Sequence, residues 1–181
     1  MKVSLKNNKA AEIRLLQRED KDSLYNYLRL LSPESRSRFG PHSFDRGTIY
    51  AIFDQPDETI HRYIAIDEMD QTIIAYMLIK QGMIDADRQR YSERNQFFNR
   101  ETTVTFAPSV ADAWQSTGLG SVMASFIEED LKKKNIRHII LWGGVQATNT
   151  KAVNFYKKTG YQFIASFWYD EKDNHDMIKE L

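Results

Sequence analysis

The sequence predicts a mixed α/β fold, with a central, mostly antiparallel sheet flanked by helices. Alternating apolar and polar residues over 11–17 predict a first strand, and the strands expected over 60–66 and 72–80 form a hairpin around a turn near Asp70. In the second half, a strand, a helix, a strand and a helix follow one another. This order predicts a parallel strand pair with a right-handed crossover, so the sheet should be mixed.

The other elements have their own local signals. After Asp20, a plausible N-cap, the apolar stripe of Leu24, Tyr27, Leu28 and Leu31 predicts a helix, and Pro33 suits the first turn of another. The remaining elements are expected, in order, as a helix over 44–53, a strand over 102–110, a helix from Leu119 to the lysines at 132–134, a strand over 136–142, a helix over 149–159 ended by Gly160, and a hairpin of 161–169 with 177–181.

Two segments depart from these regular patterns. Pro108 cannot donate to a strand ladder, which predicts a bulge or a sheet edge within 102–110. The stretch 82–100 is polar, long for a connection, and mixes acidic residues with arginines. We expect a helical excursion or a lid there, with charges that favour neither a cationic nor an acidic substrate.

The composition is that of a globular chain without an unusual partner. Its 181 residues, 41% hydrophobic and 28% charged, predict one domain over 1–181, with a core from about residue 10. Basic and acidic residues are equal at 25 each, so no nucleic-acid or membrane partner is expected. The absence of cysteine excludes a disulfide framework, a thiolate zinc site and a cysteine nucleophile, and we expect no metal. Residues 1–8 contain no apolar run, so we expect a cytoplasmic protein.

A glycine-containing turn, Gln115–Gly120, stands between an expected strand and an amphipathic helix. Glycines let the backbone approach a phosphate oxygen, and the first N–H groups of the helix together with its dipole favour an anion. A simple turn before a helix is the alternative. Two other phosphate motifs fit less well, because a Rossmann turn needs glycine where Met123 stands and a P-loop needs Lys with Ser or Thr after the second glycine.

Two stretches together resemble the GNAT superfamily of acyl-CoA N-acyltransferases. Val110–Gly120 matches the family's strand followed by Q/R-x-x-G-x-G, and Asn149–Tyr161 matches its second signature of Asn, Ala, Phe-Tyr, and Gly with an aromatic residue. The resemblance implies acetyl-CoA as cosubstrate and a GNAT-like sheet whose parallel fourth and fifth strands splay apart. It also implies cofactor contacts from Val110, Gln115, Ser116, Thr117, Gly118, Leu119, Gly120, Ser121, Asn149, Ala152, Phe155 and Tyr156.

The resemblance also implies a mechanism of direct attack in a ternary complex. The pantetheine arm would pair with the backbone near Val110 as an added strand does. An amine would attack the thioester, and Tyr156, at the family's usual tyrosine position, is the candidate acid for the departing thiolate.

The general base is the point at which this sequence departs from the family pattern. Many relatives carry glutamate on the fourth strand, where Thr105 stands here and cannot serve as a base. Glu101 shares the strand parity of Thr105 but lies about 13 Å away at strand rise, so it would need another substrate pose or a water chain. His42 and His61 are alternatives with suitable intrinsic pKa values.

The partner that the resemblance implies is an amine acceptor: a small molecule, a peptide N-terminus or a lysine side chain. Leu31–Arg36 and Trp114–Gly120 are similar to the branch containing protein-lysine acetyltransferase domains. The family's acceptor site corresponds to 32–53, 82–100 and 169–174 here. A homodimer is left open, and the alternative functions are a non-catalytic acyl-CoA-binding module and an interaction protein that kept the fold without the cofactor.

Overall fold

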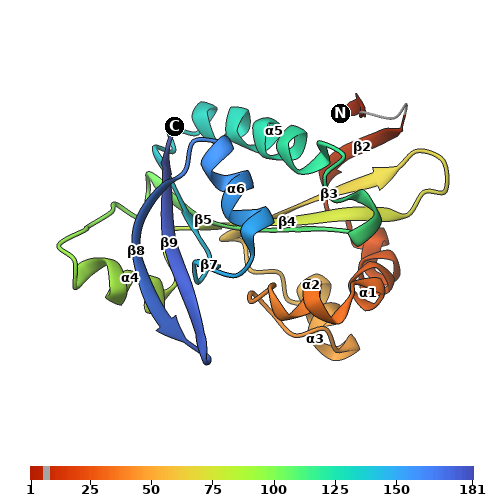
Figure 1. Ribbon diagram of the computed structural model, residues 1–181. Coiled ribbons are helices and arrows are strands. Elements are labelled where there is room, and N and C mark those ends of the chain that lie inside the picture. Colours follow the sequence, from red (N-terminus) through yellow and green to blue (C-terminus); the bar gives the residue numbers. More distant parts are fainter. Residues whose placement is uncertain (6–8) are drawn as a thin grey trace. The chain divides into compact units, whose positions relative to one another are not determined.

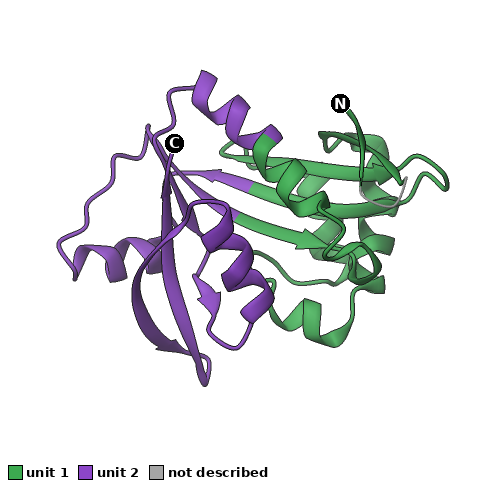
Figure 2. Ribbon diagram, turned by 45° about the horizontal axis from the view of Figure 1, so that its top comes forward, with its two compact units in different colours: residues 1–78, 107–125 green, residues 79–106, 126–181 purple. Residues whose placement is uncertain are grey.

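The computed structural model describes residues 1–5 and 9–181, which form two compact units. Unit 1 consists of 1–78 and 107–125, and unit 2 of 79–106 and 126–181 (Figure 2). Three elements continue from one unit into the other: strand β4 (Ile73–Gln81), strand β5 (Thr103–Val110) and helix α5 (Leu119–Lys133). The strands are buried along almost their whole length, as expected for strands covered on both faces.

Unit 1 is an antiparallel sheet with helices on two sides. Its strands follow the order β1 (Lys2–Ser4), β2 (Ala10–Leu15), β3 (Ile60–Asp67) and β4, and then the last part of β5. Figure 1 shows three helices on one side of these strands, α1 (Lys21–Leu30), α2 (Pro33–Ser37) and α3 (Arg46–Asp54), with the first turns of α5 on the other. Short 3₁₀ turns lie at Arg18–Asp20 (η1) and Asp112–Trp114 (η2). The expected hairpin and the Pro33 helix start are confirmed, whereas β1 was not predicted.

The side chain of Asp20 does not cap α1, although the residue stands at the N-cap position as expected. Instead it accepts two hydrogen bonds from the Arg14 guanidinium, at 2.7 and 2.8 Å, and one from the Gln17 N–H at 2.7 Å. Burial raises the pKa of Asp20, but these hydrogen bonds outweigh burial and the pKa is lower than usual. The carboxylate therefore ties β2 to the start of α1.

Asp20→Asn should lower the free energy of unfolding by about 1.5–3 kcal/mol near neutral pH, because it removes a charge-assisted pair at a buried position. Since folding depresses the Asp20 pKa, this stabilisation is present above about pH 4 and is lost as the pH falls through the folded-state pKa. Urea unfolding of wild type and variant across this range measures it. Glu19→Gln, at an exposed neighbour, should change stability by less than about 0.5 kcal/mol. A deficit of equal size at all pH values would contradict the ionic explanation.

The register in which strands β4 and β5 pair explains how the sheet accommodates Pro108. Two hydrogen bonds fix this register, from the Gly82 N–H to the Thr103 carbonyl and from the Ala111 N–H to the Ile74 carbonyl. Every second residue of β5 then bonds to β4, and Pro108 falls between these positions with its nitrogen directed away from β4. On that side β5 pairs with β6 (His138–Leu141) only from Thr103 to Phe106, in parallel. Proline thus stands where the second ladder has ended, which confirms the expected edge.

Unit 2 completes the sheet with a parallel pair and a long final hairpin. Its order is β4, β5, β6 and β9 (Lys172–Glu180), and β9 also pairs with β7 (Val145–Gln146) and β8 (Gln162–Tyr169). Helix α6 (Thr150–Lys158) precedes β8. The mixed sheet and the parallel crossover are therefore as expected. The final strand begins at Lys172 rather than at residue 177, because polar residues 172–176 pair with β8 although they break the apolar pattern.

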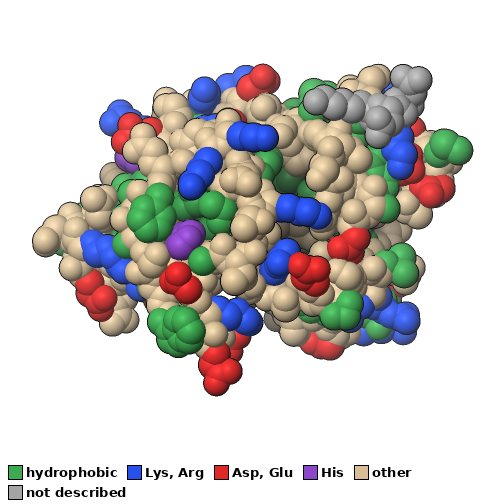
Figure 3. Space-filling model, viewed as in Figure 1, with side chains coloured by type: hydrophobic (Ala, Val, Ile, Leu, Met, Phe, Trp, Pro, Cys, Tyr) green, Lys and Arg blue, Asp and Glu red, His purple; other side chains and the backbone are tan. Residues whose placement is uncertain are grey.

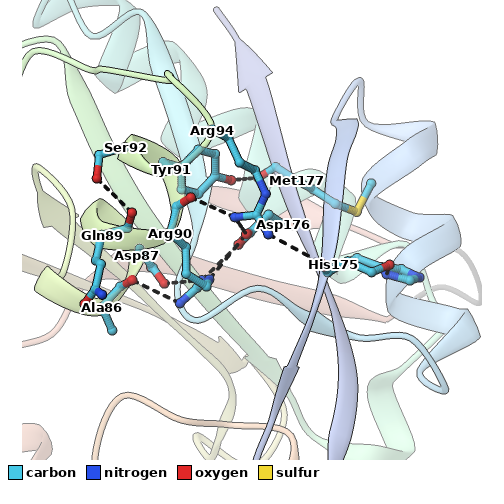
Figure 4. A network of polar contacts seen from close by, with 11 residues as sticks. Ala86, Asp87, Gln89, Arg90, Tyr91, Ser92, Arg94, His175, Asp176 and Met177 are labelled. Atoms are coloured by element: carbon cyan, nitrogen blue, oxygen red, sulfur yellow. Dashed lines mark hydrogen bonds and ion pairs between the residues drawn. The ribbon is translucent and has the colours of Figure 1, made fainter.

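The stretch 82–100 contains helix α4 (Asp85–Ser92), held by a buried ionic network. Asp87 and Asp176 are almost wholly buried, and Nη2 of Arg90 lies 2.5 Å from the first carboxylate and 2.9 Å from the second (Figure 4). Arg94 lies 3.7 Å from Asp176, and the Gly143 N–H donates to Asp87 at 3.1 Å. Burial raises the pKa of Asp87, against these favourable contacts. The expected helical excursion is thus tied to β9.

Charges of both signs are interspersed with hydrophobic side chains on the face shown in Figure 3. Within residues 1–5 and 9–181, no helix has the length and apolar character needed to span a membrane. The same residues contain no group of three or more His, Cys, Asp or Glu side chains arranged to hold a metal ion.

Candidate functional site

The glycine turn in unit 1 has the backbone geometry of an anion cradle. Ser116 and Gly118 both have positive φ values, of 64° and 92°, on either side of Thr117. Thr117 ties the turn together, because its hydroxyl donates to the Trp114 carbonyl at 2.7 Å. The first i→i−4 bond of α5 runs from the Val122 N–H to the Gly118 carbonyl, so the N–H groups of residues 119–121 precede it. Such a turn at a helix N-terminus suits the pyrophosphate of coenzyme A.

Asp112 connects this turn to the start of α2. Its carboxylate accepts hydrogen bonds from the Ser32 N–H, the Ser32 hydroxyl and the Ser35 hydroxyl, at 2.7–2.9 Å. Burial raises the pKa of Asp112, but the serine hydrogen bonds outweigh it and the pKa is lower than usual. The Gln115 amide lies 3.3 Å from the Ser35 hydroxyl and 3.4 Å from the Val110 carbonyl. The two short motifs that resemble one branch of the family therefore contact each other.

Sequence reasoning missed Asp112. Its only signal is an acidic residue just before Gln115 and a Ser-Pro helix start far upstream, and neither reveals the other. The contact depends on a chain separation of 80 residues, which no local pattern encodes.

Val110, the expected backbone partner of the pantetheine arm, points its polar groups away from β4. The register of the β4–β5 pair places Val110 at a position whose backbone does not bond to β4. Its carbonyl accepts the weak Gln115 hydrogen bond, and its N–H is directed the same way. This edge of β5 suits an extended ligand that adds as a strand would.

In unit 2, the second signature forms the first and last turns of α6. The Asn149 side chain caps the helix by accepting from the Ala152 N–H at 3.2 Å. Tyr156 is buried between aromatic neighbours, with ring centroids 5.3 Å from Phe155 and 5.1 Å from Tyr161. Burial raises the pKa of Tyr156, so its hydroxyl is protonated at neutral pH. It can therefore act as a proton donor.

The candidate bases differ in what surrounds them. Thr105 is fully buried and its hydroxyl donates to the Gly82 carbonyl at 2.8 Å, so it is a structural residue that links β5 to the end of β4. Glu101 is exposed in the turn before β5, and its N–H donates to Asn99. His61 is exposed on β3, whereas His42 is half-buried between α2 and α3.

Comparison with known proteins agrees with these features. The sequence profile described as "Acetyltransferase (GNAT) family" matches residues 24–161. No curated protein matches the chain significantly.

Among solved structures, the chain is similar to the GNAT domain of S. lividans PAT, with a TM-score of 0.77 and 17% identity over 100% of this chain and 96% of that one. It is also similar to the ribosomal-protein-S5-alanine acetyltransferase from Vibrio fischeri, with a TM-score of 0.75 and 13% identity over 99% and 96% of the two chains.

A third similar structure is the PaiA N-acetyltransferase from Thermoplasma acidophilum in complex with coenzyme A, with a TM-score of 0.66 and 17% identity over 94% of this chain and 99% of that one. These identities are low, so the three likenesses concern the fold. The profile match covers most of the chain, and together with the glycine turn and the α6 signature it shows that this protein belongs to the acetyltransferase (GNAT) family.

Proposed function

We propose that this protein is an acetyl-CoA-dependent N-acetyltransferase, with one GNAT-type domain over residues 1–181, and that its acceptor is a primary amine. The observation that carries the proposal is the turn at 115–121, with alternating left-handed residues at a helix N-terminus. A similar structure contains coenzyme A, and another is named for an alanine acceptor, which supports the same class of cosubstrate and acceptor.

In this proposal the cofactor residues divide into three groups. The turn residues Gln115, Ser116, Thr117, Gly118, Leu119, Gly120 and Ser121 hold the pyrophosphate by their backbone. Val110 pairs with the pantetheine arm through its N–H. Asn149, Ala152, Phe155 and Tyr156 contribute from α6, where Asn149 also sets the start of the helix.

The proposed transfer replaces the carbon–sulfur bond of the thioester with a carbon–nitrogen bond. The amine nitrogen forms a bond to the thioester carbonyl carbon with its lone pair, and the amine gives up a proton. The carbon–sulfur bond then breaks, its electron pair leaves with sulfur, and Tyr156 supplies the proton that makes coenzyme A thiol. Glu101 is the candidate base that accepts the proton of the amine, and its exposed carboxylate would need a connecting water to reach it.

Two measurements separate this proposal from its alternatives. Calorimetry with acetyl-CoA tests binding, and no measurable heat would leave only an interaction protein that kept the fold. Thiol release across amines, amino acids and lysine peptides tests catalysis. Binding without thiol release from any amine would favour the non-catalytic acyl-CoA-binding module, for which the threonine at position 105 is the supporting observation.

Gly118→Ala should weaken acetyl-CoA binding about tenfold. At φ 92° a side chain costs about 1–2 kcal/mol, and that strain is relieved by moving the turn away from the cradle geometry. Steric contact is not the cause, because an added Cβ would meet no atom within 4 Å.

The matched control is Gly40→Ala, where an added Cβ also meets nothing within 4 Å and φ is not positive. Calorimetry should give this control wild-type affinity. Equal affinities for all three proteins would mean that the turn geometry does not contribute to binding.

A further inference from the structure

Unit 1 contains a cluster of three buried polar atoms that make no hydrogen bond of good geometry within the described residues. They are Nε2 of His42, the hydroxyl of Tyr76 and Nε of Arg62. The three side chains are mutual neighbours: the ring centroids of His42 and Tyr76 are 5.8 Å apart, the Arg62 charge acts on both, and the Arg62 guanidinium is close enough to the Tyr76 hydroxyl oxygen to lower its pKa as a hydrogen-bond donor. Burying an unpaired polar group costs stability, so three in one place suggest a ligand that pairs with them.

The protonation pattern of the cluster follows from its surroundings. Nδ1 of His42 lies 2.9 Å from the Ser43 carbonyl oxygen, which can only accept, so Nδ1 carries the proton. Burial and the Arg62 charge lower the pKa of His42, so the ring is neutral and Nε2 is an acceptor. Tyr76 and Arg62 are donors, because burial raises the pKa of Tyr76 to about 12. The cluster therefore offers one acceptor and two donors.

Aromatic rings enclose the cluster on the side of His42. Phe39 and Phe44 lie 5.2 and 6.4 Å from the His42 ring, centroid to centroid. His42 and Phe44 are only half-buried, and the segment 39–45 that carries them forms neither helix nor strand. A ligand would therefore approach the cluster from the side of this segment.

Tyr76, the member of the cluster on β4, lies one strand away from the expected path of the pantetheine arm along β5. The register of the β4–β5 pair places Tyr76 opposite Ser109, the residue before Val110. Paired residues point to the same face of a sheet, and Ser109 on that face bonds to Tyr27 of α1. Tyr76 therefore faces the helices that precede β3, and residues 32–53, one of the expected acceptor regions, lie among these helices.

We propose that His42, Tyr76 and Arg62 form a subsite for the acceptor, and that it takes a primary amine with a carbonyl oxygen on the neighbouring carbon, as in an amino acid amide or a peptide N-terminus. Nε2 of His42 accepts from the amine N–H, and Tyr76 and Arg62 donate to the oxygen. The Arg62 charge also favours the neutral form of the amine, which is the form that attacks. This inference rests on the proposed acetyl transfer and names its substrate class.

The test compares alaninamide, an alanine tripeptide, free alanine and Nα-acetyl-lysine amide as acceptors, with thiol release as readout. Wild type should prefer the first two over the lysine ε-amine. Tyr76→Phe should raise KM for alaninamide about tenfold, because the donor to the oxygen is lost. It should leave the melting temperature nearly unchanged, because within residues 1–5 and 9–181 the hydroxyl makes no hydrogen bond of good geometry and its contact with Arg62 is weak.

The matched control is Tyr27→Phe, at a second buried tyrosine of unit 1 whose hydroxyl does bond, to Ser109 at 2.8 Å. It should lower the melting temperature and leave the KM for alaninamide unchanged. His42→Phe keeps an aromatic ring and should abolish the preference for α-amines by removing the acceptor.

Failure of the acceptor subsite and failure of the proposed acetyl transfer give different results. Acetylation of the lysine ε-amine but not of alaninamide would overturn the subsite and leave acetyl transfer standing, as would an unchanged KM in Tyr76→Phe. Thiol release from none of the amines would overturn the proposed function. Calorimetric titration of alaninamide into wild type and Tyr76→Phe then tests the subsite without turnover, and equal affinities would overturn it.

Discussion

Tyr156→Phe is expected to lower kcat about 10²-fold or more, with the dissociation constant of acetyl-CoA nearly unchanged. The variant loses only the hydroxyl, so the ring contacts with Phe155 and Tyr161 persist. Steady-state thiol release and calorimetry measure the two quantities separately. A loss in kcat without a loss in binding is typical of a group that acts in the transition state.

The physical reason is the protonation state of the phenol. Burial raises the pKa of Tyr156, which keeps the proton in place until the carbon–sulfur bond breaks and the thiolate appears. No hydrogen bond to this hydroxyl is found in the part of the chain that the structure describes, so stability should change little. Loss of catalysis would then not be a consequence of unfolding.

Tyr161→Phe is the matched control for this prediction. Tyr161 is equally buried, belongs to the same aromatic cluster, and also has a pKa raised by burial. Removing its hydroxyl should leave kcat at the wild-type value. If Tyr156→Phe also retains full turnover, Tyr156 is a packing residue and another group protonates the thiolate.

Arg90→Met should lower the free energy of unfolding by about 3–5 kcal/mol, because it leaves buried carboxylates without their main partner. The guanidinium binds both Asp87 and Asp176, and it also lies over the Phe167 ring with its central carbon 3.8 Å from the centroid. Methionine keeps part of the packing volume. Chemical denaturation measures the loss.

Arg88→Met is the control, since it makes the same change two residues away on the same helix. Arg88 pairs with Asp85 at 3.4 Å, and both side chains are largely exposed. An exposed pair contributes about 0–1 kcal/mol, so the control should be close to wild type. Similar losses in both variants would mean that burial of the Asp87 network does not determine its contribution.

The Arg90→Met deficit should also shrink at low pH. Burial already raises the pKa of Asp87 in the folded protein, and loss of Arg90 raises it further. A carboxyl with a raised folded-state pKa destabilises the fold as the pH rises from the unfolded pKa, about 3.9, through the folded one. Below that range Asp87 is neutral in both states. A deficit independent of pH would indicate lost packing instead.

The sequence by itself determined the fold class, the family and most of the elements. The apolar stripe of α1, the hairpin of β3 and β4 and the turn before α5 are local patterns, because helix and strand periods and turn residues act over a few positions. The two signatures also identified the residues proposed to bind acetyl-CoA. Local chemistry placed Asp20 correctly at the N-cap position of α1 but did not predict the partners of its side chain, which accepts from Gln17 in the preceding turn and from Arg14 on β2.

Only the tertiary structure decided which polar side chains meet. Asp112 bonds to serines 80 and 77 residues away, Arg90 to Asp176 across 86 residues, and His42 reaches Tyr76 from a segment without regular structure. Chain crossings and strand register produce such contacts, and no periodicity along the sequence reports them. For the same reason the sequence predicted a coenzyme A site from its turn, while the candidate acceptor subsite emerged only from the fold.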